Sequence, residues 1–199
     1  MRLSSCFETL APHAEKVIVV CALGMAANEW WDVTQNEETF YMHGAMGFAS
    51  SFALGLALSV PDEPVWIIDG DGSLSMNLGT LLTAGGMAPK NLKHLLVENG
   101  CYQTAGSVPM VGSPQRDYGA IAKGAGVERV LQISSLEELQ AALPALHEEG
   151  HCFVVLHVDP DDRPITAPPQ PFEGPEMKYR FGRAMERRFG VKVFGPEGY

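Results

Sequence analysis

The chain has 199 residues, of which 46% are hydrophobic and 19% charged, a composition that suits a globular domain with a full core and excludes general disorder. Its net charge of −10 disfavours nucleic acids and anionic membranes as partners. No apolar run of 18 residues occurs, and the first ten residues lack the pattern of a signal peptide. Four scattered cysteines without a CxxC motif argue against a zinc site or a disulfide framework, so we expect reduced thiols and a cytoplasmic location.

Short apolar runs alternate with helical stretches through the first 160 residues. Strands are expected at 17–21, 65–69, 92–97, 127–133 and 152–158. Helices are expected at 45–59, at 74–84 with a stop at Gly85-Gly86, at 117–123, and from a cap at Ser134 or Ser135 to about residue 149. Continuous apolar strands that alternate with helices predict an α/β fold of three layers, with a parallel sheet covered by helices on both faces.

The composition changes after residue 160. Residues 161–174 are rich in proline and predict a linker, and residues 176–190 predict a basic helix. The segment 161–199 holds seven basic and six acidic residues, whereas residues 1–160 hold seven basic and 18 acidic. We therefore divide the chain into a domain of residues 1–160 and an extension of residues 161–199. The basic helix has three open roles: folding over an acidic face of its own chain, capping a partner subunit, or forming a solvated surface.

Polar residues follow two of the expected strands. The strand at 65–69 runs into Gly70-Asp71-Gly72-Ser73, a turn whose glycines let backbone N–H groups approach an anion. Asp71 would repel a phosphate unless a cation lay between them, which points to Mg²⁺. The next strand ends at Glu98-Asn99-Gly100, where the Asn99 amide and the Cys101 carbonyl offer neutral oxygen ligands. On these residues alone, a plain tight turn with an aspartate cap is an equal alternative.

The spacing between these two motifs resembles that of the thiamine diphosphate enzymes. Their motif opens with GDG and closes with paired asparagines, and here GDG is followed by 26 residues and then Asn99. Glu98 departs from the motif, because it stands in the first asparagine position. Upstream, Gly44-Ala45-Met46-Gly47 and the helix of small residues are similar to the segment that holds the cofactor's two rings. The resemblance covers about residues 15–160 and implies the diphosphate-binding module of the thiamine diphosphate-binding fold.

Roles for individual residues follow from this resemblance. It implies that Asp71, Asn99 and the Cys101 carbonyl hold Mg²⁺, and that Gly70, Gly72 and Ser73 face the diphosphate. It also implies that the Gly44 carbonyl accepts a hydrogen bond from the pyrimidine amino group and that Met46 wedges the cofactor into its folded shape. Tyr102 is then expected to line the pocket, and His43 to act at the catalytic centre. Plainer alternatives are core packing for Met46, a structural role for His43, and an ordinary loop for Tyr102, Gln103 and Thr104. The doublet Trp30-Trp31 suits an interface or a core equally, and His94 is expected to be packed or at an edge.

The matched region accounts for only half of the family's composite site. The pyrimidine-binding domain, which supplies the activating glutamate, does not fit into 199 residues. The chain thus resembles the β subunit of two-subunit decarboxylases of the sulfopyruvate and phosphonopyruvate decarboxylase type. This implies an α2β2 or larger complex with a pyrimidine-binding subunit, acting on a small 2-oxo acid that the sequence does not identify. A carboligase, a 2-oxo acid oxidoreductase subunit and a non-catalytic cofactor-binding module are the alternatives.

Overall fold

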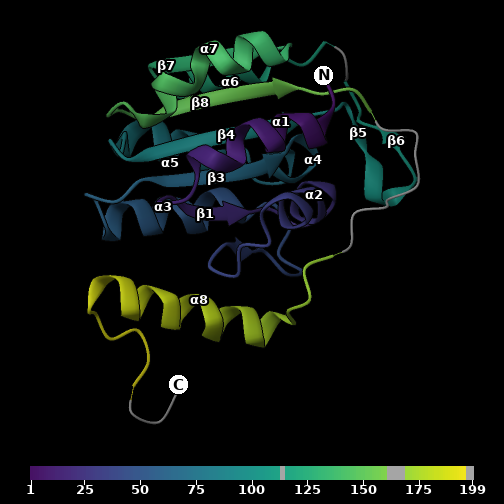
Figure 1. Cartoon of the computed structure of the whole chain (residues 1–199). Helices are drawn as coiled ribbons and strands as arrows, with labels where there is room; N and C mark the ends of the chain where they lie inside the picture. The colour runs from purple at the N-terminus through teal and green to yellow at the C-terminus, as the bar shows by residue number, and fades with distance from the viewer. Residues whose placement is uncertain (113–114, 161–168, 196–199) are drawn as a thin grey trace.

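One six-stranded parallel sheet forms the centre of the computed structural model, which describes residues 1–112, 115–160 and 169–195 (Figure 1). The strand order is β2-β1-β3-β4-β8-β7, so β2 and β7 form the two edges and the last strand, β8, inserts between β4 and β7. The expected parallel α/β fold and all five expected strands are confirmed, and the short edge strand β2 was not foreseen. The strands are β1 (Ile18–Cys21), β2 (Phe40–Tyr41), β3 (Val65–Gly70), β4 (Leu92–Glu98), β7 (Arg129–Ile133) and β8 (Cys152–His157).

Helices cover both faces of the sheet (Figure 1). One layer consists of α1 (Leu3–Leu10), α2 (Met25–Thr34) and α7 (Leu136–His147). The other consists of α3 (Ala49–Ser59), α4 (Asp71–Ser75), α5 (Gly79–Met87) and α6 (Tyr118–Gly124). A hairpin of β5 (Cys101–Tyr102) and β6 (Val108–Pro109) follows β4, and short 3-10 turns span Ala11–His13 and Gln103–Ala105. The helices α1 and α2 were not predicted, because both are short and neither has a side-chain N-cap.

Side-chain caps fix the starts of α6 and α7. The Asp117 carboxylate accepts a hydrogen bond of 2.9 Å from the Ala120 backbone N–H. The Ser135 hydroxyl accepts one of 3.1 Å from the Glu138 N–H, and the Glu138 carboxylate in turn accepts from the Ser134 N–H at 2.7 Å. This reciprocal pattern is close to a capping box, and it selects Ser135 over Ser134 as the cap.

The expected helix at 74–84 is wrong in both its start and its end. Helix α4 begins at Asp71, directly after β3, and a break at residues 76–78 separates it from α5. Gly85 and Gly86 do not stop α5, which continues to Met87 and ends where Ala88 adopts a left-handed conformation. Gly85 serves packing instead, since a Cβ there would lie 2.1 Å from the Ala125 carbonyl oxygen.

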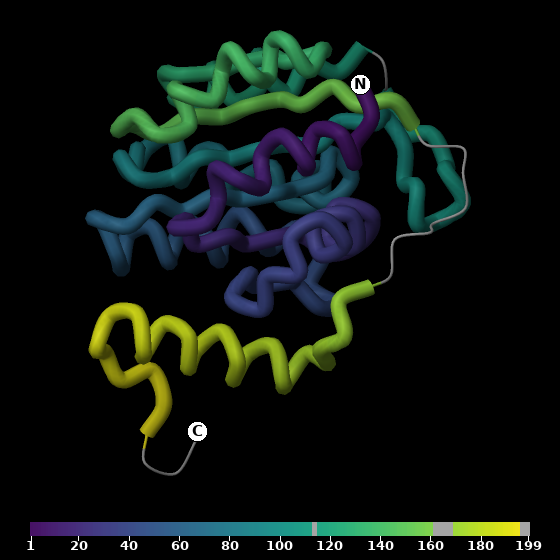
Figure 2. The backbone as a smooth tube through the Cα atoms, viewed as in Figure 1, coloured from purple at the N-terminus to yellow at the C-terminus, as the bar shows by residue number. Residues whose placement is uncertain are grey.

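The C-terminal helix α8 (Gly174–Phe189) lies along the β2 edge of the molecule (Figure 2). Its buried Phe181 packs against Phe40 and Phe52, with ring centroids 5.1 Å and 6.1 Å apart. Ion pairs join Arg180 to Glu37, Arg187 to Glu38 and Arg188 to Glu63 at 2.7, 3.4 and 2.6 Å. Of the three roles left open for the basic helix, it therefore folds over an acidic strip of its own chain. The boundary expected after residue 160 and most of the linker lie outside the described residues.

The tryptophan doublet belongs to the core. Trp30 is fully buried, meets Phe7 edge-to-face with centroids 5.3 Å apart, and donates its indole N–H to the Thr39 hydroxyl at 3.3 Å. Trp31 packs between Tyr41 and Phe172.

Among the described residues, no helix combines the length and the apolar character needed to cross a membrane.

Candidate functional site

The carboxyl ends of β3 and β4 bring Asp71 and Asn99 to one edge of the sheet. The two strands are hydrogen-bonded parallel neighbours, so the residues that follow them lie side by side. Asp71 is 3% exposed, and its carboxylate oxygens accept hydrogen bonds from the Gly72 N–H at 2.7 Å and the Gly100 N–H at 2.8 Å. The second bond ties the turn after β3 to the turn after β4, where Gly100 has a φ of 72°.

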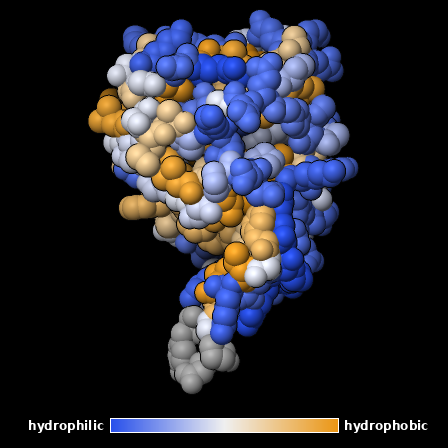
Figure 3. All heavy atoms as spheres, turned by 90° about the vertical axis from the view of Figure 1, so that its left-hand side faces the viewer, coloured by the Kyte–Doolittle hydropathy of each residue, from blue (hydrophilic) through white to orange (hydrophobic). Residues whose placement is uncertain are grey.

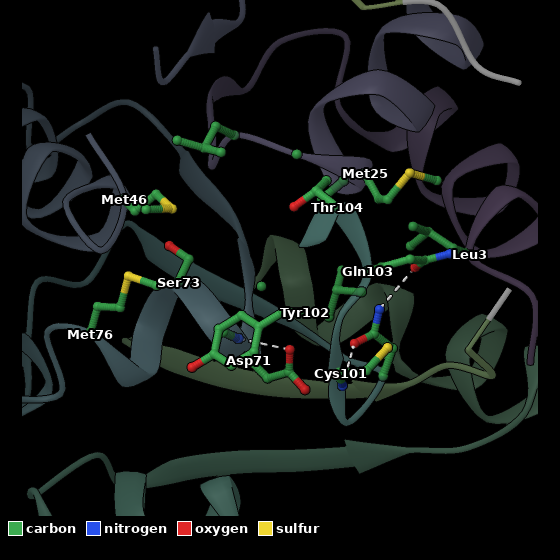
Figure 4. A pocket seen from close by; sticks show the side chains of 17 residues that line it. Leu3, Met25, Met46, Asp71, Ser73, Met76, Cys101, Tyr102, Gln103 and Thr104 are labelled. Carbon is green, nitrogen blue, oxygen red and sulfur yellow. Dashed lines mark hydrogen bonds between the residues drawn. The ribbon is translucent and has the colours of Figure 1, made fainter. Parts of the chain in front are cut away.

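The orientation of the Asn99 amide is fixed by two neighbours. Its oxygen accepts a hydrogen bond from the Cys101 N–H at 3.1 Å, and its nitrogen donates to the Gln103 side-chain oxygen at 3.0 Å (Figure 4). An amide oxygen has two lone pairs, so one lone pair of Asn99 is left by this arrangement. The site therefore presents a neutral oxygen beside a carboxylate.

Burial raises the pKa of Asp71 above its usual range, and backbone hydrogen bonds from Gly100, Gly72 and Asn99 oppose that effect. The ionised carboxylate is thus held at a cost that a nearby cation would offset. No cluster of three or more His, Cys, Asp or Glu side chains suited to a metal occurs in the described part of the chain. A cation at Asp71 would have to complete its shell with amide, carbonyl and ligand oxygens, as Mg²⁺ does in proteins that bind phosphates.

A cavity of about 100 Å³ opens beside these residues. Eight of the ten predicted site residues line it: Met46, Gly70, Asp71, Gly72, Ser73, Asn99, Cys101 and Tyr102. The Tyr102 ring lies over Gly72, where a Cβ would come within 2.7 Å of a ring carbon. Ligand pockets usually measure roughly 300–1,000 Å³, so this cavity would enclose only part of such a ligand.

Hydrogen bonds also join the segment 44–47 to the region that follows Asp71. The Gly47 N–H donates to the Ser73 hydroxyl at 3.2 Å, and the Asn77 amide donates to the Gly47 carbonyl at 3.0 Å. Gly47 has a φ of 81°, and an added Cβ would lie 3.1 Å from the Met76 Cβ. This close approach places the segment 44–47 against α4, and sequence reasoning had not assigned roles to Asn77 or Met76.

The Met46 side chain, the Gly44 carbonyl and the His43 ring have different surroundings. Met46 lines the cavity and is 51% exposed, so core packing does not describe it. Gly44 has a φ of 71°, and no hydrogen bond to its carbonyl occurs within the described residues. His43 does not line the cavity; its ring lies beside Gly174 at the start of α8, where a Cβ would be 3.4 Å away.

Glu98 turns away from the cavity and pairs with His157. Their strands align these two residues, and the Glu98 carboxylate lies 2.9 Å from His157 Nδ1. Burial raises the pKa of Glu98, and His157 counteracts part of that rise. The residue that departs from the paired-asparagine pattern therefore joins β4 to β8.

Sequence reasoning missed several neighbours of the site. Asp69 is fully buried in β3, accepts a hydrogen bond from the Gly70 N–H at 2.9 Å, and lies 3.6 Å from His94 Nε2. His94 is buried in a central strand, in agreement with the packed alternative. The remaining lining residues that carried no prediction are Leu3, Leu23, Gly24, Met25, Ala26, Met76 and Val97. In Figure 4, Leu3 and Met25 lie across the cavity from Met46 and Met76. Only Gly24, a glycine three residues after the end of a strand, gave a usable signal.

The fold and the site together define a class: a parallel α/β domain with a carboxylate–amide pair at the carboxyl ends of two neighbouring strands. Residues 19–158 match the family model of the thiamine pyrophosphate enzyme, C-terminal TPP binding domain, and the chain belongs to this family. The residues fit the cofactor, because the buried Asp71 carboxylate and the Asn99 oxygen line one cavity with the backbone of Gly72 and Ser73 beside them.

The relatives include both separate subunits and longer chains. The chain is 37% identical over 177 residues to sulfopyruvate decarboxylase subunit beta of Methanocaldococcus jannaschii, covering 87% of this chain and 90% of that one. It is 37% identical over 160 residues to phosphonopyruvate decarboxylase of Streptomyces viridochromogenes, covering 80% of this chain and 40% of that one. A crystal structure of benzoylformate decarboxylase from Polynucleobacter necessarius has the same fold, with a TM-score of 0.69, 23% identity, and coverage of 82% of this chain and 34% of that one.

Proposed function

We propose that the chain is the diphosphate- and Mg²⁺-binding subunit of a two-subunit thiamine diphosphate-dependent 2-oxo acid decarboxylase, a carboxy-lyase of the sulfopyruvate or phosphonopyruvate decarboxylase type. The observation that carries the proposal is the buried Asp71, which is hydrogen-bonded to Gly100 and therefore fixed beside Asn99 at the cavity. The near-complete match to a protein named subunit beta supports the division of the enzyme between two chains.

In this proposal Asp71, the Asn99 oxygen and the Cys101 carbonyl hold Mg²⁺ against the diphosphate. The backbone around Gly70, Gly72 and Ser73 faces the same diphosphate, and Tyr102 covers it. All of these residues belong to one half-site, because each of them lines the same cavity. The proposal keeps 1–160 as the cofactor-binding domain and 161–199 as the extension, in line with a family match that ends at residue 158.

Thiamine diphosphate supplies an electron sink for the decarboxylation of 2-oxo acids. The chain's residues would position the reacting groups. The Gly44 carbonyl, which has no other hydrogen bond among the described residues, would accept from the pyrimidine amino group, and the exposed Met46 side chain would support the cofactor rings. His43 is the candidate proton donor or anion contact, although its ring packs beside Gly174 and does not line the cavity.

The second half of the site comes from a pyrimidine-binding subunit in an α2β2 or larger complex. A cavity of about 100 Å³ is too small to enclose a whole thiamine diphosphate, which supports a site completed by another chain. That partner would supply the activating glutamate. The cytoplasmic location expected from the scattered cysteines without a CxxC motif is part of the same proposal.

The first experiment is capture of the tagged full-length chain from its native cell extract, with mass spectrometry of what accompanies it. We expect a stoichiometric partner with a pyrimidine-binding domain. The purified complex is then assayed for CO₂ and aldehyde release from sulfopyruvate, phosphonopyruvate and pyruvate, with added Mg²⁺ and thiamine diphosphate. A parallel complex carrying Asp71→Asn corrects for contaminating decarboxylases.

The outcomes separate the alternatives. Consumption of a 2-oxo acid with a carbon–carbon coupled product identifies a carboligase, and consumption that requires an electron acceptor identifies an oxidoreductase. A complex that binds the cofactor and transforms no 2-oxo acid supports a non-catalytic module. Self-association of the chain without any pyrimidine-binding partner would overturn the composite site.

A further inference from the structure

Arg116 does not itself line the cavity, and hydrogen bonds to hydroxyl groups hold it near the turn that carries Asp71. Its Nη1 donates to the Tyr118 hydroxyl at 2.7 Å and to the Ser75 hydroxyl at 3.2 Å. Its guanidinium also lies over the Tyr118 ring, 5.6 Å from the centroid. The arginine is thereby oriented by side chains from α4 and α6, although it belongs to neither helix.

These hydroxyls connect Arg116 to the turn that carries Asp71. Tyr118 is 2% exposed, and its hydroxyl donates to the Asp71 carbonyl at 3.2 Å and lies 2.7 Å from the Ser75 hydroxyl. A buried tyrosine with three polar neighbours has little freedom to move. Arg116 is therefore placed in relation to Asp71 by a rigid hydrogen-bonded network.

Arg116 differs from Arg129 and from the arginines of α8 in its partners. Each arginine of α8 pairs with a carboxylate, and Arg129 pairs with Glu148. Within residues 1–112, 115–160 and 169–195, no carboxylate oxygen lies within 4 Å of the Arg116 guanidinium. Hydroxyl partners orient a guanidinium without neutralising it. A chain of net charge −10 thus keeps an oriented positive charge beside the site where it would hold anions.

We propose that Arg116 binds a tetrahedral oxyanion at the half-site: the terminal phosphate of the cofactor's diphosphate, or the sulfonate or phosphonate group of the substrate. This inference rests on the proposed function. The planar guanidinium presents paired N–H donors that match such oxyanions. Nη1 makes the hydrogen bonds to the Tyr118 and Ser75 hydroxyls and a 3.9 Å contact to the Met110 sulfur. Nη2 and Nε lie beside Gly112, where a Cβ would be 3.4 Å from Nη2, and no hydrogen bond from either occurs within the described residues, which leaves both donors to an anion. Where the anion is the diphosphate, Arg116 would add a second positive charge to that of the Mg²⁺ that Asp71 would hold.

The test begins with binding, which does not depend on turnover. Calorimetric titration of the two-subunit complex with magnesium pyrophosphate compares wild type, Arg116→Gln, Arg116→Lys and Arg129→Gln. Arg129 is a matched control, because it lies at the amino end of β7, at the opposite edge of the sheet. We expect Arg116→Gln to weaken pyrophosphate binding roughly 10- to 100-fold, as for loss of hydrogen bonds to a charged group. Arg116→Lys should retain part of the affinity, and Arg129→Gln should change it less than twofold.

A second measurement distinguishes the two sources of the oxyanion. If Arg116 binds the substrate, pyrophosphate affinity stays at the wild-type value, while Arg116→Gln raises KM for sulfopyruvate or phosphonopyruvate at least about tenfold and leaves KM for pyruvate, which lacks the second anion, unchanged. A purely structural arginine would lower Tm and change neither pyrophosphate affinity nor the ratio of these KM values, and that result overturns the inference. Wild-type complex that binds no pyrophosphate would instead overturn the proposed function itself.

Discussion

The two ends of strand β4 lie next to buried charges that are satisfied in different ways. At the amino end, Lys93 is 2% exposed, and its ammonium donates to the backbone carbonyls of Glu148, at 2.8 Å, and Gly150. At the carboxyl end, Asp71 is 3% exposed and accepts from two backbone N–H groups. Burial disfavours the charged form of both, lowering the pKa of Lys93 and raising that of Asp71.

The difference lies in what surrounds each charge. Lys93 ties β4 to the connection between α7 and β8, so its bonds hold chain segments together. Asp71 lines a cavity together with the oxygen of Asn99. Figure 3 views the molecule from the amino-end side, where hydrophilic and hydrophobic residues are mixed on the surface. The buried charge of Lys93 at the amino end of β4 stabilises the fold, whereas the buried charge of Asp71 at the carboxyl end is available to a ligand.

The largest effect is expected from Asp71→Asn in the two-subunit complex. Removing the carboxylate should weaken Mg²⁺-dependent thiamine diphosphate binding by at least about 100-fold, because even partners of metal ligands contribute 10- to 100-fold. The free energy of unfolding should change by about 1 kcal/mol or less, since one hydrogen bond is lost while a desolvated charge is relieved. Calorimetric titration and urea unfolding measure the two quantities, with the exposed Asp62→Asn as control. Equal cofactor affinity in both variants would remove Asp71 from the site.

The second prediction concerns how the free energy of unfolding depends on pH through His151, which directly precedes β8 at the amino ends of the strands. Burial lowers the pKa of His151 to about 4, and neither ring nitrogen has a hydrogen-bond partner among the described residues. Because the unfolded chain takes up this proton near its ordinary pKa of about 6.5, stability is complete above that pH and falls as the pH drops towards 4. The loss should reach about 3 kcal/mol relative to His151→Leu, which cannot titrate. Urea unfolding at pH 7, 5.5 and 4 measures the difference, and parallel pH profiles for the two proteins would contradict it.

The variant Lys93→Met tests whether the buried charge at the amino end of β4 contributes to stability and not to cofactor binding. The two carbonyls lose their donor in a buried place, which should lower the free energy of unfolding by about 1–3 kcal/mol. Thiamine diphosphate affinity in the complex should stay within twofold of wild type. A variant that folds with wild-type stability, or that loses cofactor affinity without losing stability, would contradict the division between the two edges.

The smallest effect is expected at an exposed ion pair. Arg187 and Glu38 lie 3.4 Å apart with 67% and 54% of their side chains exposed, so water screens their attraction. Arg187→Gln should change the free energy of unfolding by less than about 0.5 kcal/mol. Thermal unfolding checks this value, and a change above 1 kcal/mol would mean that α8 depends on its charges more than on its buried Phe181.

The sequence predicted the strands and the first layer of the site because those features depend on local patterns. Continuous apolar runs identify buried strands, and Asp71 and Asn99 stand directly at strand ends. The Met46 segment was also identified from its residue types. Helix α2 and the lining residues near Gly24 were missed, because their place at the cavity depends on packing between elements that are far apart in the chain.

Two errors show where local rules give way to packing. Gly85-Gly86 has the composition of a helix stop, yet the helix continues to Met87, and the glycine at 85 is explained by its close approach to the Ala125 carbonyl. Arg116 follows a loop of proline and glycine and carried no signal. Its significance comes from Tyr118 and Ser75, two hydroxyls that only the folded chain brings together.

Helix α8 has a consequence for anyone who shortens this chain. The family match ends at residue 158, but the apolar side of α8 covers β2 and the rings of Phe40 and Phe52. A fragment cut at that boundary would expose an edge strand with unpaired backbone groups next to bare aromatic rings. Such an edge is a template for strand pairing between molecules, so the fragment should aggregate even though it retains every proposed Mg²⁺ ligand.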